Sequence, residues 1–147
     1  MGIEAAEDSC VFCAIVAGRS ESSLVHEDEH VVAFMDVRPV TTGHLLVVPR
    51  AHAESLETLT EDLGARLFRV AHRLAGTLRR SGLPCEGVNI FVADGTVAGQ
   101  EVFHVHLHVV PRTAGDGFAV RARRGTPGRS ELNEAARQIR AAGAAPV

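Results

Sequence analysis

The sequence predicts an α+β domain in which a five-stranded, mostly antiparallel sheet packs against one long helix and is followed by a short C-terminal helix. Three observations predict this fold. Apolar residues recur at steps of three and four between Leu63 and Leu78, which is the spacing of one helix face. Short runs of aliphatic and β-branched residues, bounded by turn residues, occur at several places along the chain. The length of 147 residues fits one domain with a substantial core.

The first half of the chain is expected to hold one short helix and three strands. Residues 10–17 are mostly apolar and end at Gly18, which is typical of a short helix with a glycine stop. The three predicted strands share aliphatic and β-branched residues and lie at 24–26, 31–35 and 44–48. An acidic turn separates the first two strands, and a glycine and a proline bound the third.

The second half begins with the long helix. Thr60 is a suitable N-cap, and Glu61 and Asp62 suit the first turn because they are acidic. The helix should end near Ser81, since Gly82 and Pro84 follow. Later elements are expected as strands at 87–92 and 103–110, an irregular arginine-containing stretch at 111–129, and a last helix capped by Ser130. The domain organisation expected from this pattern is a flexible segment at 1–9, a core at 10–112 and a C-terminal extension at 113–147.

Composition excludes several function classes. The net charge of −3 provides no basic field for a nucleic-acid polymer, and the chain has no Trp or Tyr for stacking on bases. The acidic start without an apolar run predicts no signal peptide, no membrane segment and a cytoplasmic protein. Three cysteines do not suggest a disulfide framework, and Cys85 is interpreted as a small apolar residue.

Three histidines alternate with aliphatic residues late in the chain. In a strand, His104, His106 and His108 would share one face, while Val105 and Leu107 would face the core. A merely solvated face is a weak explanation, because Thr, Lys or Glu more commonly serve there. The imidazoles can bind a metal ion or act on phosphate. The residues alone leave both chemistries open.

The segment before these histidines suits an anion. A strand at 87–92 leads into a turn at Asp94-Gly95 and then into Ala98-Gly99-Gln100. Glycine lets backbone N–H groups approach a phosphate closely. The sequence therefore predicts a phosphate-binding loop beside the histidine strand.

These residues resemble the histidine-triad (HIT) family. The resemblance is carried by Gly99-Gln100, Val102, His104, His106, His108 and the following Val109-Val110-Pro111-Arg112. Two upstream blocks also match, at 34–39 and 43–52, and the segment 10–15 resembles the family's N-terminal segment. The resemblance covers about residues 10–112. It implies a purine-nucleotide hydrolase that cleaves at the α-phosphate of a nucleoside phosphoramidate or dinucleoside polyphosphate.

The resemblance also implies roles for the histidines. His106 would attack the α-phosphate and form a nucleotidyl-histidine intermediate, which a neutral imidazole can do near pH 7. His108 would donate to a phosphate oxygen or the leaving group, and His44 would support the triad, which His104 completes. No catalytic metal is required. Two alternatives stay open: a nucleotidyltransferase that passes the group to another acceptor, and a non-catalytic nucleotide-binding protein.

The substrate-binding residues implied by the resemblance surround this triad. Asp36 would accept the ribose hydroxyls, and Gln100 would position the phosphate and leaving group. The remaining substrate-binding positions are Asn89, Val102, Phe12, Ile15, Phe34, Val37 and Leu46, and most of the apolar ones would form a purine slot. Any single one of these apolar residues is equally typical of a core.

A structural zinc site is the second implication. Cys10 and Cys13 can supply two thiolates, and the resemblance completes the ligand set with His52 and His104. The alternative is a pair of small buried residues without metal. Related proteins form twofold dimers, so a homodimer is expected here.

Two departures from the family pattern concern the substrate. Ala93 stands where Asn or Gln is frequent, so a ribose contact is absent. Glu101 stands where Ser or Thr is frequent, and an ionised carboxylate cannot donate to phosphate. Either Glu101 points away from the phosphate or the preferred substrate differs.

Overall fold

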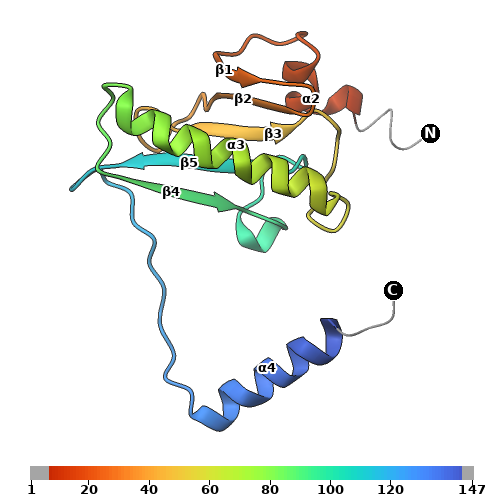
Figure 1. The fold of residues 1–147 in the computed structure, drawn as a ribbon, viewed down its shortest axis with the longest axis vertical. Helices are drawn as coiled ribbons and strands as arrows, with labels where there is room; N and C mark the ends of the chain where they lie inside the picture. Colours follow the sequence, from red (N-terminus) through yellow and green to blue (C-terminus); the bar gives the residue numbers. More distant parts are fainter. Residues whose placement is uncertain (1–6, 144–147) are drawn as a thin grey trace.

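The α+β prediction is confirmed by the computed structural model, which describes residues 7–143. The sheet has five strands in the order β1-β2-β3-β5-β4, and each neighbouring pair is antiparallel (Figure 1). The strands are β1 (Leu24–Glu27), β2 (Val31–Met35), β3 (Leu45–Pro49), β4 (Gly87–Val92) and β5 (Leu107–Arg112). The central strands β2, β3 and β5 hold most of the buried residues of the sheet.

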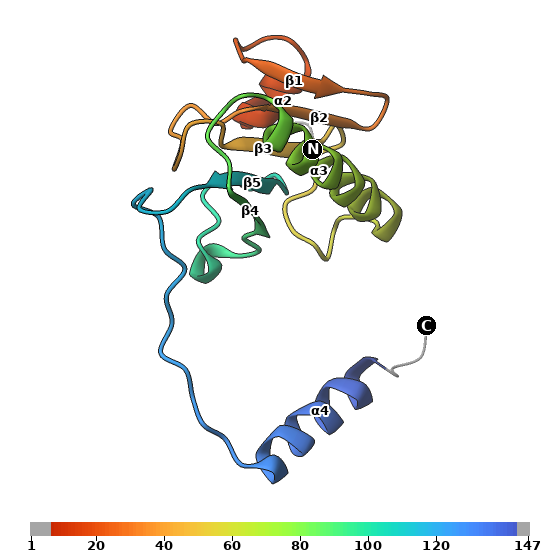
Figure 2. The ribbon, with the colours of Figure 1, turned by 60° about the vertical axis from the view of Figure 1, so that its left-hand side comes forward.

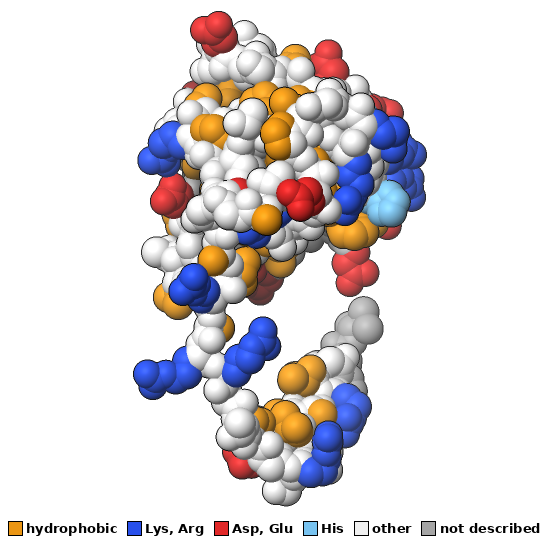
Figure 3. Space-filling view, turned by 90° about the vertical axis from the view of Figure 1, so that its left-hand side faces the viewer, with side chains coloured by type: hydrophobic (Ala, Val, Ile, Leu, Met, Phe, Trp, Pro, Cys, Tyr) orange, Lys and Arg blue, Asp and Glu red, His pale blue; other side chains and the backbone are white. Residues whose placement is uncertain are grey.

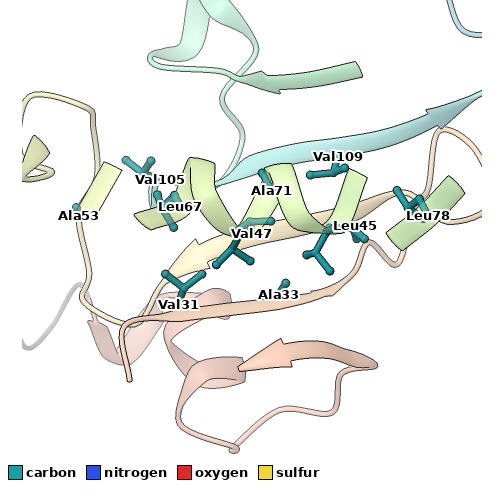
Figure 4. Packing of buried hydrophobic residues seen from close by; sticks show 12 residues of the cluster. Val31, Ala33, Leu45, Val47, Ala53, Leu67, Ala71, Leu78, Val105 and Val109 are labelled. Atoms are coloured by element: carbon teal, nitrogen blue, oxygen red, sulfur yellow. The ribbon is translucent and has the colours of Figure 1, made fainter. Parts of the chain in front are cut away.

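One face of the sheet is covered by the long helix α3 (Glu61–Arg80). Its N-cap is Thr60, whose side chain accepts from the Leu63 N–H as expected. Leu67, Ala71 and Leu78 point from α3 onto Val47 and Val109 of the sheet (Figure 4). This cluster is the main hydrophobic core, and it holds β3 and β5 rigidly beneath the helix.

The opposite face of the sheet carries a smaller apolar cluster and α2 (Val11–Val16). Alternate residues of β2 and β3 supply it: Phe34 and Leu46 point to this side, whereas Ala33 and Val47 point to α3. Phe12 of α2 packs edge-on against Phe34, with ring centroids 5.5 Å apart. The face away from α3 is therefore only partly closed by α2.

The histidine strand is shorter than expected. Strand β5 begins at Leu107, so His104 and His106 precede it in a bent segment. In that segment the Val105 N–H donates to the Ala53 carbonyl at 2.7 Å instead of to a strand. The alternating sequence is the same whether the Val105 N–H bonds to a strand or to this loop. The pattern alone therefore could not reveal the bend.

The C-terminal extension lies away from the rest of the molecule. An extended arm leads to α4 (Arg129–Gly143), which lies beyond β4 in two views (Figures 1 and 2). The helix begins one residue before its expected cap, Ser130. The arm is anchored by Arg112, which pairs with Asp116 at 2.6 Å and lies over the Phe118 ring. The expected flexible segment 1–9 falls largely on residues 1–6, which lie outside the described residues, as do 144–147.

Within residues 7–143, no helix combines the length and apolar character that a membrane crossing requires.

Candidate functional site

A cavity of about 740 Å³ opens on the face of the sheet away from α3. It lies between α2, the end of β2, β5 and the loop after β4. Of the residues that the sequence implicates, those lining it are Phe12, Ile15, Phe34, Asp36, Val37, His44, Leu46, Val102, His106 and His108. Its wall thus combines an apolar part with a carboxylate and three imidazoles.

His106 has one nitrogen fixed by the backbone. Its Nδ1 lies 2.7 Å from the His104 carbonyl oxygen, and because a carbonyl only accepts, Nδ1 carries the proton. Burial lowers the pKa of His106, so the ring is neutral near pH 7. A neutral ring protonated at Nδ1 has its lone pair on Nε2. His106 is therefore in the form that a nucleophile needs.

A chain of hydrogen bonds fixes the proton of His108. The Val40 N–H donates to His44 Nδ1 at 3.0 Å, so a neutral His44 carries its proton on Nε2. That Nε2 lies 2.9 Å from His108 Nδ1 and donates to it. His108 then carries its own proton on Nε2. Because burial lowers the pKa of His108 to about 4, the ring is a neutral donor in the cavity wall.

Asp36 lies beside this chain at the end of β2. One carboxylate oxygen accepts from the Arg38 N–H at 2.9 Å, and the other is 3.6 Å from His44 Nε2. Burial lowers the pKa of His44 more than this carboxylate raises it. The ligand atoms of Asp36, His44 and His108 lie within 4.8 Å of one another.

A second cluster lies beside the cavity, where α2 meets the segment before β5. It consists of Cys10, Cys13, His52 and His104, whose ligand atoms also lie within 4.8 Å of one another. The distance from Cys13 Sγ to His52 Nδ1 is 3.3 Å, and both sulfurs lie 3.5 Å from His104 Nδ1. A tetrahedral zinc ion with bonds of about 2.0–2.3 Å separates its ligand atoms by about 3.3–3.8 Å. The four residues fit such an ion.

The chemistry of the donors also fits a cation. His104 Nε2 donates to the Pro49 carbonyl at 2.8 Å, which leaves the lone pair of Nδ1 directed at the cluster. Burial, with a smaller contribution from Cys10, raises the pKa of Cys13 to about 12. A thiolate there needs a positive charge beside it, and a metal ion supplies one.

His104 belongs to both clusters. Its imidazole lies among the cysteines, while its carbonyl oxygen accepts the His106 proton. Phe12, between the two cysteines in sequence, packs edge-on against His104 at 5.9 Å and His106 at 5.0 Å. The position of the cysteine pair is thus transmitted to His106 by two routes.

Three expected site residues do not line the cavity. His104 is fully buried behind it, because the bend before β5 turns its ring to the cysteines. Gln100 is buried, and its amide bonds to backbone groups of Gly95, Glu54 and Val102. It holds the loop in shape and has no free group for a phosphate. Asn89 lies on the same face of β4 as Phe91 but outside the cavity lining, and its side chain accepts from Arg112 at 2.6 Å.

Two features of the cavity were missed from the sequence. Phe91 stacks on His108 with centroids 4.4 Å apart, and the two are cross-strand partners, so correct strand pairing would have found the contact. Arg38 pairs with Glu101 at 3.1 Å where both line the cavity mouth. The Glu101 carboxylate is thus directed to a cation, and Ala93 presents only a methyl group. No local signal in the sequence reveals the Arg38–Glu101 pair.

The chain resembles known proteins over most of its length. A model of the HIT domain matches residues 17–115. Protein hit of Bacillus subtilis is 43% identical over 112 residues, which is 76% of this chain and 77% of that protein. A HIT family protein from Bacillus anthracis has a crystal structure that matches with a TM-score of 0.86 and 35% identity, covering 92% of this chain and 97% of that one.

Two further solved structures carry informative descriptions. A zinc-bound histidine triad family protein from Mycobacterium smegmatis is 41% identical, with a TM-score of 0.74, covering 92% of this chain and 99% of that one. A histidine triad nucleotide-binding protein from Candida albicans is 26% identical, with a TM-score of 0.84, covering 92% and 98%. Since β5 ends at Arg112 and the chain has 147 residues, matches over 92% of it extend into α4.

Proposed function

Since this chain belongs to the HIT family, we propose that it is a nucleotide-binding hydrolase acting at the α-phosphate of a nucleoside phosphoramidate or a dinucleoside polyphosphate. The observation that carries the proposal is the state of His106. Its ring is neutral, its Nδ1 proton is held by a backbone carbonyl, and it lines a cavity large enough for a nucleotide.

The reaction proceeds in two displacements. His106 Nε2 attacks the α-phosphorus, forming a P–N bond while the bond to the leaving group breaks. The His104 carbonyl stabilises the imidazolium through the Nδ1 proton. The leaving group takes the Nε2 proton of His108.

Water completes the cycle. Its oxygen attacks phosphorus, the P–N bond breaks, and the electron pair returns to His106. The proton of the water returns to His108 Nε2, which the His44 chain keeps in position. The product is a nucleoside monophosphate. Transfer to another acceptor would use the same intermediate, with a phosphate group in place of water.

The cavity offers separate places for the parts of a nucleotide. The Asp36 side chain lines the cavity and can accept the two ribose hydroxyls with its carboxylate. The purine lies against Phe12, Ile15, Phe34 and Leu46, with Val37 and Val102 at the edge. Gln100 contributes by holding the loop, and Asn89 has no direct contact.

Zinc is the proposed resident metal, held by Cys10, Cys13, His52 and His104. Its role is structural, since all four tetrahedral positions are filled by protein ligands and none is left for substrate. In this proposal it fixes α2 against the segment before β5. The protein acts as a cytoplasmic homodimer without a nucleic-acid or membrane partner.

The test is mass spectrometry of the enzyme, quenched rapidly during turnover of a slow substrate. The expected result is a nucleoside-monophosphate adduct on His106. A panel of phosphoramidates and dinucleoside polyphosphates, with and without added phosphate acceptors, separates hydrolysis from transfer. An adduct on another residue, or turnover without any adduct, would contradict the mechanism.

A further inference from the structure

Phe91 lies directly opposite His108 across two neighbouring strands. The two residues are register partners of β4 and β5, and the side chains of such a pair lie on one face of the sheet. Val88 and Ile90 of β4 pack against the core beneath α3, so by alternation Phe91 points to the other side, where it lines the cavity. The register of the sheet therefore brings an aromatic ring to the proposed proton donor.

The stack on Phe91 restrains His108 in a direction that its hydrogen bond leaves free. The 2.9 Å hydrogen bond between His44 Nε2 and His108 Nδ1 holds one atom of the imidazole, about which the ring can still tilt. The Phe91 ring lies almost parallel to the imidazole, with 10° between the two planes and 4.4 Å between the centroids. A stacked contact of this kind sets the plane of a ring. The two contacts together fix where His108 Nε2 points.

The direction of His108 Nε2 matters because the cavity has little else to assist a leaving group. Arg38 is the only arginine among the described residues that line the cavity, and it pairs with Glu101 at 3.1 Å. The basic side chains of the arm between β5 and α4 stand clear of the body, and the arginines within 121–124 are exposed (Figure 3). Within residues 7–143, protonation of the leaving group therefore depends on His108.

A second pair of Phe and His side chains, on α3, has a different geometry. Phe68 and His72 are four residues apart on one helix, a spacing at which side chains meet. Their ring centroids are 6.4 Å apart, their planes are inclined by 50°, and both residues are exposed. This pair belongs to neither histidine cluster, so Phe68 is a matched control for Phe91.

We propose that Phe91 is a positioning residue: its stack on His108 keeps Nε2 directed at the leaving group and thereby speeds the departure of leaving groups that must take a proton. The proton passes from Nε2 to the leaving atom as the bond between that atom and phosphorus breaks. Phe91 itself makes no bond and transfers no proton. This role rests on the proposed function, and it deepens it by adding a residue that acts through His108.

The experiment compares two substrates that differ only in how much their leaving group needs a proton. One is a nucleoside phosphoramidate of an alkylamine, which cannot leave as an anion, and the other is the p-nitrophenyl ester of the same nucleotide, which can. Release of the leaving group is measured in single turnovers. With Phe91→Leu, the loss of rate on the phosphoramidate should exceed the loss on the ester by about tenfold, because a tilted donor is misplaced by a fraction of an ångström. KM should change equally for both substrates.

Two variants serve as controls. Phe91→Tyr keeps the stacked ring and should restore most of the phosphoramidate rate. Phe68→Leu removes a similar exposed ring and should leave both rates unchanged. If Phe91→Leu melts at a lower temperature than Phe68→Leu, Phe91→Val supplies the same comparison with a side chain that suits a strand.

The outcomes separate this role from the proposed function. Equal losses on the two substrates, or no loss on either, would overturn the positioning role while the adduct on His106 still forms. A wild-type protein that forms no adduct on His106 with either substrate would overturn the proposed function, and the role of Phe91 with it. A Phe91→Tyr protein as slow as Phe91→Leu would also overturn the role, because the stacked ring would then be irrelevant to the rate.

Discussion

Two clusters of this protein bring histidines together with thiols or a carboxylate within 4.8 Å, yet their hydrogen bonds prepare them for different chemistry. In the cysteine cluster, Nε2 of His104 donates to a backbone carbonyl, so Nδ1, which faces the cysteines, offers a lone pair. In the cavity cluster, Nδ1 of His44 accepts from a backbone N–H, so Nε2, which faces His108, holds a proton. The first arrangement suits a metal ion, and the second suits proton donation.

Proximity of ligand types is therefore insufficient to predict a metal site. A cation between Asp36, His44 and His108 would require the His44 Nε2 proton to leave while an N–H still points at Nδ1. The hydrogen-bond partner of the ring nitrogen that points out of the cluster decides between metal coordination and acid–base chemistry.

The largest expected effect separates the reacting histidine from both clusters. His106→Ala removes the attacking nitrogen, so turnover should fall by about three orders of magnitude or more. Nucleotide affinity and metal content should change little. Stopped-assay kinetics, calorimetry and elemental analysis measure the three quantities. The control is His26→Ala, because His26 lies on β1, pairs with Asp28 and belongs to neither cluster. An active His106→Ala protein would sink the mechanism.

Next is the loss of the cysteine cluster. Cys13→Ser should lower the metal content from about one ion per chain and lower the melting temperature by at least about 5 °C. Turnover should fall but stay measurable, because Phe12 and the His104 carbonyl lose their anchor without being removed. Cys85→Ser is the control, since Cys85 lies outside both clusters. A metal-free wild-type protein, or unchanged melting of Cys13→Ser, would show that no structural metal is bound.

Asp36→Asn tests whether the cavity cluster also holds metal. The amide donates where the carboxylate accepts from ribose, so nucleotide should bind about tenfold more weakly. Metal stoichiometry measured on the same preparation should be identical to that of the wild type. A lower metal content in this variant would mean that the two clusters are less different than their hydrogen bonds indicate.

The two cavity histidines also predict how stability and turnover depend on pH. Burial lowers the pKa of His108 from its ordinary 6.5 to about 4, so between these values the unfolded chain binds more protons than the folded one. The contribution of His108 to the free energy of unfolding should therefore be fully present above pH 6.5. It should decline by on the order of 2 kcal/mol as the pH falls toward 4. Because the pKa of His106 is also lowered, the acidic limb of turnover should lie below pH 6.5. Urea unfolding and turnover rates measured between pH 4 and 8 check the two predictions. A loss of turnover that begins above pH 7 on acidification would contradict the second.

The smallest effect is expected at the cavity mouth. Arg38 and Glu101 are both mostly exposed, and such ion pairs stabilise a fold by about 0–1 kcal/mol. Glu101→Gln should leave the melting temperature unchanged and alter turnover by less than about threefold. A large change in the ranking of substrates would instead make this pair a determinant of specificity.

The sequence predicted the elements of the fold because each has a strong local signal. The Thr60 cap, the apolar spacing in α3 and the β-branched residues of the strands are each signals that span only a few residues. The resemblance predicted which residues gather around the cavity. The contacts of Gln100 and Asn89 could not be predicted, because they depend on which backbone group or arginine each amide meets across the fold. The bend at His104 was missed for the same reason, since its partner Ala53 lies far away in sequence.

The proton positions on His44, His104 and His106 share one property: main-chain atoms of Val40, Pro49 and His104 set them. A side-chain substitution at those three positions keeps the N–H or C=O in place, except where proline would delete the donor at position 40. This pattern of protonation is therefore shielded from most point mutations. Side chains around the cavity can therefore change during evolution, and with them the substrates that fit. The backbone atoms that set the proton positions stay the same.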